Sequence, residues 1–223
     1  QGIHQAQTLA AASLRPVALL LCRNWCGKMM LRRDALQAIY PDLAPSVVVT
    51  IMGAVAAELY ALGHRPNFFY LEHAMGLASS MGLGIALSRP ELQVTVLDGD
   101  GSVLMNLGSL TTMARYRPAN LVHLVFDNES LLSVGRSFTT ATGTGSDIAA
   151  MAAAAGVRRT ATVHTVEELA DAFRTALAAQ ELTTIVAKVE AQGPASYFID
   201  VHMLENRFAF QRCLADLGLA GKG

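Results

Sequence analysis

The stretch that decides the fold is VTVLDGDGSVLMNLGSL, residues 94–110. It opens with an apolar run of strand length, such as parallel sheets bury on both faces, and continues with a helical pattern. Gly99, Asp100, Gly101 and Ser102 lie between the two. In a parallel α/β sheet, ligands bind at this edge, where strands end and helices begin. The free N–H groups and the dipole of the helix N-terminus favour an anion such as phosphate, and the glycines let it approach the backbone.

Apolar runs and helical stretches alternate along the rest of the chain. This pattern predicts an α/β fold, with an open, mostly parallel sheet and helices on both faces. We expect one domain over residues 30–190, after a leading segment 1–29 and before a C-terminal arm and helix at 191–223. The expected strands are 16–22, 46–51, 67–70, 92–98, 120–127, 157–162 and 183–189, and the expected helices are 3–14, 32–39, 53–62, 75–88, 103–116, 146–155, 166–180 and 204–216.

Local signals refine this picture. Thr165 followed three residues later by Glu168 is a capping-box pattern, and Ser146-Asp147 can cap the Ala-rich helix after it. The segment TTATGTGS, residues 139–146, is expected to be a mobile loop because nothing in it can anchor a core. His123 lies in the middle of a strand, where we expect a satisfied core residue.

Composition narrows the class of protein. Of 223 residues, 52 % are hydrophobic and 16 % are charged, against about 25 % charged in an ordinary soluble domain. A formal net charge of −1 gives no long-range attraction to nucleic acid or to an anionic membrane. The apolar runs are shorter than the ~18 residues that a membrane span needs. We therefore expect a soluble oligomer, and the odd number of cysteines favours the reduced cytoplasm.

A second polar group follows another buried strand. LVHLVFD, residues 121–127, ends at Asn128, and 26 residues separate Asn128 from the Gly-Asp-Gly motif. If the two strands are neighbours, Asp100 and Asn128 emerge at the same edge of the sheet. A carboxylate, an amide oxygen and a backbone carbonyl are hard ligands that suit Mg²⁺, which also shares phosphate oxygens. Asp-Gly alone is a common turn, so the prediction of a magnesium and diphosphate site depends on the strand before each residue.

These residues resemble a known family. The spacing of GDGS at 99–102 and Asn128 is similar to the thiamine-diphosphate motif of pyruvate-decarboxylase-like enzymes. Residues 67–87, NFFYLEHAMGLASSMGLGIAL, and 99–110 resemble the diphosphate-binding subunit of sulfopyruvate decarboxylase and the corresponding half of phosphonopyruvate decarboxylase. ENRFAFQRCL, residues 205–214, resembles the C-terminal end of the same group. The likeness covers about 30–215 and implies a diphosphate-binding domain with thiamine diphosphate and Mg²⁺ as cofactors.

The resemblance also implies roles for single residues. Asp100, the Asn128 side chain and the backbone carbonyl of Ser130 would bind Mg²⁺. Met75 falls where such enzymes place a bulky hydrophobe that supports the bent cofactor, and its volume and flexibility suit that role. The carbonyl of His73 would accept a hydrogen bond from the cofactor's amino group. The remaining cofactor-binding candidates are Ala74, Gly99, Gly101, Ser102, Leu131 and Leu132.

Two departures from the family fall on the substrate side. Residues 72–74 are Glu-His-Ala where relatives carry an apolar residue, Gly and Ser, and SVGR replaces TGGQ at 133–136. His73 either fills space at a domain interface or acts on the substrate, for example as a proton relay. Glu72 is either a solvated carboxylate or part of the cofactor wall. Arg136 either recognises a phosphonate or sulfonate or forms a surface ion pair.

Half of the expected active site is missing. In this family a pyrimidine-binding domain of another chain supplies the glutamate that activates the cofactor, and no second α/β domain fits in these residues. Glu58 lies in the diphosphate-binding domain, so we do not assign it that role. The helix at 3–14 and the following RPVALLLC resemble the end of a pyrimidine-binding domain, so 1–29 is either a remnant of one or an arm that packs on a partner.

The function expected from the resemblance is decarboxylation of a small anionic 2-oxo acid, such as phosphonopyruvate or sulfopyruvate, to an aldehyde. Two alternatives keep the cofactor: a carboligase similar to acetolactate synthase, and a cofactor-binding subunit without activity. A nicotinamide-binding domain is disfavoured, since the glycines at 76, 82 and 84 do not follow the dinucleotide-binding spacing.

Overall fold

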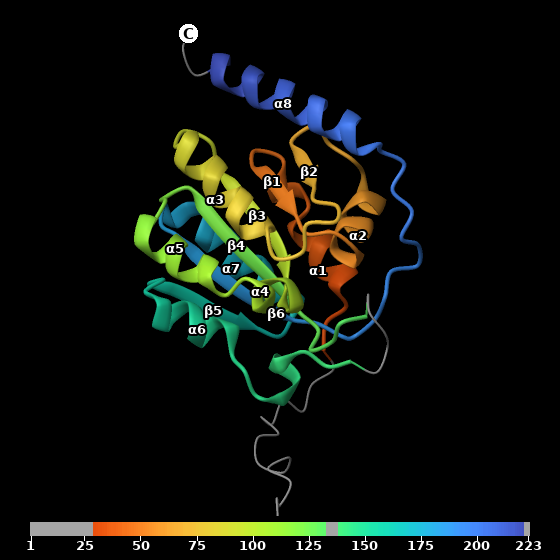
Figure 1. Ribbon diagram of the computed structural model, residues 1–223, viewed down its shortest axis with the longest axis vertical. Helices are drawn as coiled ribbons and strands as arrows, with labels where there is room; N and C mark the ends of the chain where they lie inside the picture. Colours follow the sequence, from red (N-terminus) through yellow and green to blue (C-terminus); the bar gives the residue numbers. More distant parts are fainter. Residues whose placement is uncertain (1–28, 133–137, 221–223) are drawn as a thin grey trace, which may run out of the picture.

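Six parallel strands form one sheet in the order β2-β1-β3-β4-β6-β5 (Figure 1). The computed structural model describes residues 29–132 and 138–220. The predicted α/β class is confirmed, while the strand predicted at 16–22 and the helix predicted at 3–14 lie outside the described residues. The strands are β1 (Val47–Thr50), β2 (Phe68–Tyr70), β3 (Val94–Gly99), β4 (Leu121–Asp127), β5 (Arg159–Val163) and β6 (Thr183–Lys188).

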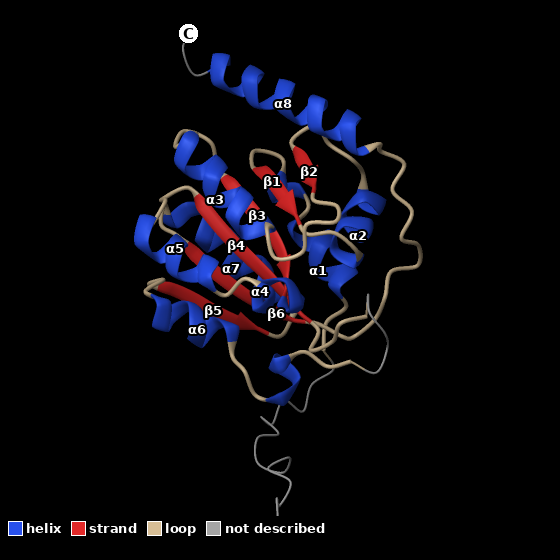
Figure 2. Cartoon of the chain, viewed as in Figure 1, coloured by secondary structure: helices blue, strands red, loops and turns tan. Residues whose placement is uncertain are grey.

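Helices cover both faces of this sheet (Figure 2). Crossovers between parallel strands are right-handed, and with this strand order they place α3, α5 and α6 on one face and α2 and α7 on the other. Helix α1 packs against α2 and α7. The helices are α1 (Arg32–Ile39), α2 (Ala54–Leu62), α3 (Ala78–Ser88), α4 (Asp100–Met105), α5 (Gly108–Tyr116), α6 (Ile148–Ala155), α7 (Val166–Ala179) and α8 (Met203–Ala220), with short 3-10 helices η1 (Pro41–Leu43) and η2 (Ala141–Thr144).

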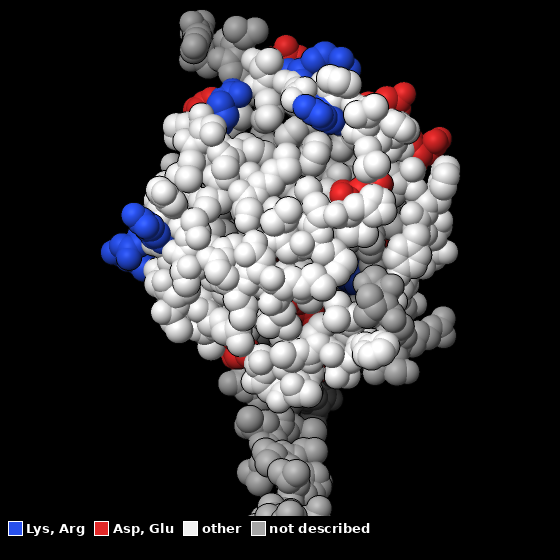
Figure 3. Space-filling view, in the orientation of Figure 1, with Lys and Arg blue, Asp and Glu red and all other residues white. Residues whose placement is uncertain are grey.

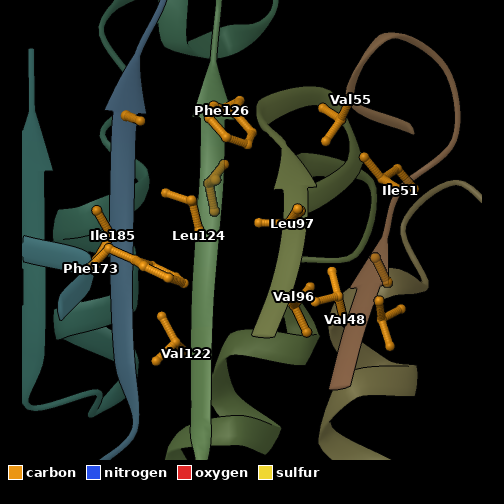
Figure 4. Close-up of a cluster of buried hydrophobic side chains, with 14 of the residues drawn as sticks. Val48, Ile51, Val55, Val96, Leu97, Val122, Leu124, Phe126, Phe173 and Ile185 are labelled. Carbon is orange, nitrogen blue, oxygen red and sulfur yellow. The ribbon is translucent and has the colours of Figure 1, made fainter. Parts of the chain in front are cut away.

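The central strands are buried along their whole length, because helices pack on both sides of them. Every residue of β1 and β4 is buried. Side chains of neighbouring strands and helices meet in one apolar core, in which Leu124 of β4 and Phe173 of α7 have no exposed surface (Figure 4). Burial of each such side chain contributes about 1.5–3 kcal/mol. No helix in the described parts of the chain combines the length and apolarity of a membrane span.

Helix α8 covers the open edge of the sheet at β2 (Figure 1). The Asn206 side chain accepts a hydrogen bond from the Tyr70 N–H at 3.1 Å and donates one to the Phe68 carbonyl at 2.8 Å. Phe210 packs on Phe69 with ring centroids 5.1 Å apart. The edge strand therefore has partners for its outward backbone groups, which would otherwise pair with another chain.

Two predicted helices have other bounds in the structure. The helix predicted at 103–116 is two helices, α4 and α5, broken at Asn106, whose side-chain amide donates to the Gly76 carbonyl at 2.7 Å. The helix predicted at 75–88 begins only at Ala78, because Gly76 has a φ of 82° in the turn before it. The predicted caps are confirmed: Thr165 and Glu168 form a capping box. Asp147 accepts a hydrogen bond at the start of α6.

Candidate active site

A pocket opens where the chain direction across the sheet reverses. From β1 the chain passes outward to β2, and from β3 it passes the other way to β4, so a crevice forms between the carboxyl ends of β1 and β3. Its volume is about 120 Å³. Nine of the residues predicted for the site line it: Met75, Gly99, Asp100, Gly101, Ser102, Asn128, Ser130, Leu131 and Leu132.

The proposed metal ligands come together in this pocket. Asp100 begins α4 directly after β3, and Asn128 follows the last residue of β4. Asn128 Oδ1 accepts the Ser130 N–H at 3.1 Å, which fixes the turn after β4. Within the described residues the Ser130 carbonyl accepts no hydrogen bond. A carboxylate, an amide oxygen and a free carbonyl are donors that fit Mg²⁺.

One glycine of the motif has a steric function. A Cβ atom added to Gly101 would collide with the side chain of Leu131, which lines the same pocket. A side chain at residue 101 would therefore force the Leu131 side chain to move out of its present position in the pocket wall. This close approach brings the two halves of the predicted motif into one site.

The segment 139–146 is anchored, so the prediction that it contains no anchor is wrong. Thr140 and Thr142 are buried, with 4 % and 5 % of their surface exposed. Thr140 Oγ1 donates to Asp100 Oδ2 at 2.6 Å. Thr142 Oγ1 donates to Asp127 Oδ1 at 2.7 Å. The anchors are polar, and sequence reasoning looked for apolar ones.

The network continues from Asp127 to the end of β6. Lys188 is the register partner of Asp127, and its Nζ atom donates to Asp127 Oδ2 at 2.7 Å and to Glu129 Oε1 at 2.8 Å. Burial acts to lower the pKa of Lys188, but the hydrogen bonds to the two carboxylates outweigh it and the pKa is raised. Lys188 therefore stays charged and holds Asp127 in place.

Asp100 is a perturbed acid. Burial raises its pKa to about 6, although the hydrogen bond from Thr140 opposes this rise, and the nearby charge of Asp127 adds to it. The two threonine hydroxyls are 2.7 Å apart. Three short contacts thus link Asp100, Thr140, Thr142 and Asp127, while the two hydroxyls supply only two protons. Because Thr140 donates to Asp100 and Thr142 donates to Asp127, the contact between the two hydroxyl oxygens has no proton of its own.

Two of the predicted cofactor-binding residues, His73 and Ala74, are not among those that line the pocket. His73 is exposed and has a φ of 54°. A glycine adopts this left-handed conformation more readily than any other residue, and glycine is what relatives carry here by the resemblance described above. Met75, two residues later, does reach the pocket.

Sequence reasoning missed part of the pocket wall. The loop after β1 and the first residues of α2 contribute Ile51 to Val55, and α1 contributes Arg32. Arg32 forms an ion pair with Glu58, and the two side chains are 4 % and 12 % exposed. The loop could have been predicted from the sequence, because it follows a buried strand, as Asp100 does. Arg136 and Val134 lie outside the described residues.

His123 is only partly satisfied, contrary to expectation. Its Nε2 atom lies 3.3 Å from Asp98 Oδ2, with both side chains fully buried. Its Nδ1 atom has no hydrogen-bond partner among the residues that the structure describes. The strand alternation that places His123 in the core also places Asp98 beside it, and this pair was not foreseen.

Comparison with known protein families identifies the family of the domain that contains this pocket. Residues 49–187 match the family described as thiamine pyrophosphate enzyme, C-terminal TPP binding domain. The chain belongs to this family. The matched range contains β1 to β6 almost completely, including the loops that form the pocket.

Curated relatives of this thiamine pyrophosphate enzyme domain carry the names expected. Phosphonopyruvate decarboxylase from Streptomyces viridochromogenes is 43 % identical over 155 residues, which is 69 % of this chain but 38 % of that protein. Sulfopyruvate decarboxylase subunit beta from Methanocaldococcus jannaschii is 39 % identical over 158 residues, which is 70 % of this chain and 82 % of the subunit. The chain therefore spans less than half of the first relative and most of the second.

Solved structures show the same fold in this family. A thiamine diphosphate-dependent 4-hydroxybenzoylformate decarboxylase from Rhodococcus jostii superposes with a TM-score of 0.63 at 22 % identity, over 74 % of this chain and 34 % of the other. Benzoylformate decarboxylase from Polynucleobacter necessarius superposes with a TM-score of 0.60 at 20 % identity, over 73 % of this chain and 33 % of the other.

Proposed function

We propose that this domain holds thiamine diphosphate through Mg²⁺ and takes part in the non-oxidative decarboxylation of a small anionic 2-oxo acid to an aldehyde. The observation that carries the proposal is the meeting of Asp100, Asn128 and Ser130 in one pocket of a thiamine pyrophosphate enzyme domain. The names of the relatives favour phosphonopyruvate or sulfopyruvate as the substrate.

The donor set fits the metal and the diphosphate. Asp100, the Asn128 amide oxygen and the Ser130 carbonyl would hold Mg²⁺, and the backbone from Gly99 to Ser102 would lie against the diphosphate. No three His, Cys, Asp or Glu side chains converge within the described ranges, so the site depends on amide and carbonyl oxygens besides its one carboxylate. When bound, the cofactor supplies a nucleophilic carbon and takes up the electrons left when CO₂ departs.

The apolar residues of the pocket would assist the loss of CO₂. Met75, Leu131 and Leu132 line the wall beside the proposed metal ligands. They exclude water from the reacting carboxylate, whose charge is dispersed as CO₂ leaves, so an apolar surrounding favours this step. Met75 would also support the bent shape of the cofactor through its volume.

The catalytic glutamate would come from a partner. The pocket of about 120 Å³ is smaller than the roughly 300–1,000 Å³ of sites that enclose a ligand. Among the described lining residues Asp100 is the one carboxylate, and the Glu58 carboxylate is paired with Arg32. A pyrimidine-binding domain, as a separate subunit or an upstream region, would complete the site.

An exposed apolar surface suited to such a partner lies on the face of the domain that α3 and α4 form. Leu77, Leu87, Met105 and Leu107 are exposed apolar residues of α3, α4 and their flanking turns. Figure 3 shows that Lys, Arg, Asp and Glu lie mainly around the margin of this face and that its centre, over α3 and α5, is nearly free of them. Depletion of charge around exposed apolar residues is typical of subunit contacts. An oligomer in the cytoplasm is the setting we propose.

Calorimetry with thiamine diphosphate and Mg²⁺ tests the site, and CO₂ release from phosphonopyruvate and sulfopyruvate tests the reaction. Asp100→Ala is expected to abolish Mg²⁺-dependent binding and turnover while circular dichroism shows an intact fold. Unchanged binding in this variant would remove the proposed site. NMR of the product separates the rivals: an aldehyde supports decarboxylation, an acyloin identifies a carboligase, and binding without turnover beside a pyrimidine-binding domain identifies a cofactor-holding subunit.

A further inference from the structure

Two threonine hydroxyls lie between the carboxylates of Asp100 and Asp127. We propose that Thr140 and Thr142 are positioning residues for the metal site: they hold the Asp100 carboxylate so that one oxygen, Oδ1, faces the cation. This inference rests on the proposed function, since it takes Asp100 as a metal ligand. It assigns a role to a loop that the family motif does not include.

The contacts show how the carboxylate is oriented. Oδ2 of Asp100 accepts the Thr140 hydroxyl at 2.6 Å and lies 3.3 Å from the Thr142 hydroxyl. Asp100 itself is 3 % exposed, so water does not solvate this oxygen freely. An unpaired buried carboxylate oxygen is costly, and the hydroxyls remove that cost for Oδ2 alone. The Gly101 N–H is a further donor to this carboxylate, and Oδ1, which takes no threonine hydroxyl, is the oxygen that we assign to the cation.

The threonines are themselves held from outside the metal site. Thr142 donates to Asp127 at 2.7 Å, and Lys188 fixes the other oxygen of Asp127 at 2.7 Å. Asp127 ends β4 and Lys188 ends β6 in register with it. The orientation of Asp100 therefore depends on two strands of the sheet, reached through η2. Partners of this kind, which orient a ligand without touching the metal, typically change metal affinity or activity 10- to 100-fold when removed.

Mg²⁺ and Ca²⁺ should respond differently to the loss of the threonine hydroxyl, because the two cations differ in size and coordination. Mg²⁺ needs near-octahedral geometry with one oxygen from each carboxylate, whereas Ca²⁺ accepts both oxygens and irregular geometry. A carboxylate released from Thr140 can turn and offer both oxygens. Loss of the hydroxyl should then weaken Mg²⁺ binding more than Ca²⁺ binding, whereas general damage to the pocket would weaken both alike.

The test compares four variants of the protein, assayed with thiamine diphosphate and either Mg²⁺ or Ca²⁺ by calorimetry. Thr140→Val removes the hydroxyl at nearly constant shape and is expected to lower Mg²⁺-dependent cofactor affinity about tenfold or more. Thr140→Ser restores the hydroxyl and should bind like the wild type. Thr142→Val should fall between the two. Thr139→Val, at an exposed neighbouring position, is the matched control and should change nothing.

The outcomes separate this inference from the function on which it rests. No Mg²⁺-dependent binding by the wild type would overturn both. Wild-type binding that Thr140→Val and Thr142→Val leave unchanged, or that they weaken equally for Mg²⁺ and Ca²⁺, would overturn the positioning role alone. Thermal unfolding without cofactor shows whether each variant is folded. If Thr140→Val does not fold, Thr142→Val decides: a selective loss of Mg²⁺ affinity supports the inference, and wild-type affinity overturns it.

Discussion

Arg32 and Glu58 are joined by two parallel hydrogen bonds beside the pocket, from Nε to Oε2 at 2.9 Å and from Nη2 to Oε1 at 3.0 Å. The same guanidinium donates to the Gln192 carbonyl at 3.0 Å. The pair thus connects α1, α2 and the start of the C-terminal arm. Both oxygens of Glu58 are engaged, which suits a structural role better than proton transfer.

Glu58→Gln should destabilise the protein strongly, because it leaves a buried guanidinium without its counter-charge. We expect the free energy of unfolding in urea to fall by about 3–5 kcal/mol. Asp171→Asn breaks the exposed pair with Arg174, in which the side chains are 80 % and 54 % exposed, and should cost less than about 1 kcal/mol. Equal losses in the two variants would show that the pair beside the pocket is no more important than a surface ion pair.

Mg²⁺ binding should depend on pH through Asp100, whose pKa burial raises to about 6. The pKa of Asp100 in the folded protein lies above the ordinary aspartate value of about 4. Asp100 therefore contributes to the stability of the cofactor-free protein below about pH 4, and this contribution is lost as the pH rises through about 6. By the proposed function, the cation would bind the ionised carboxylate and displace its proton. Calorimetry between pH 5 and 8 should show affinity falling on the acid side. Affinity that is constant over this range would contradict the prediction.

His73→Gly should leave the fold and the cofactor affinity intact. The φ of 54° at His73 costs a side-chain-bearing residue strain that glycine does not have, while glycine loses more entropy on folding, so stability should change by less than about 1 kcal/mol. Because the imidazole is exposed and outside the pocket lining, binding should stay within about twofold. A larger loss, or loss of one limb of the pH–rate profile alone, would instead show that the imidazole acts in the site.

Asn206→Ala should uncover the edge of the sheet. The variant leaves the Tyr70 N–H and the Phe68 carbonyl without their partner, which should lower the free energy of unfolding by about 2 kcal/mol or more. The exposed strand should also increase association, measured by light scattering. Gln211→Ala, at an exposed position of the same helix, is the control. Loss of stability in the control alone would contradict the assigned role of Asn206.

The sequence predicted what depends on local pattern. Buried strands and amphipathic helices produce recognisable patterns of apolar residues in the sequence, so the sheet and most helices were predicted. Asp100 and Asn128 were recognised because parallel strands end at one edge, whatever the distance between them along the chain. The hydrogen bond from Thr140 to Asp100 joins residues 40 positions apart through one hydroxyl, and no pattern in the sequence indicates it. The break at Asn106 was missed for the same reason, since its cause is a bond to Gly76 in another turn.

The cover that α8 provides over β2 also limits how a neighbour can join. With Asn206 occupying the outward backbone groups of Tyr70 and Phe68, no foreign strand can be added on that side to continue the sheet. At this edge a neighbour can therefore contact the domain only through side chains. A neighbour held in this way could leave again without opening the sheet.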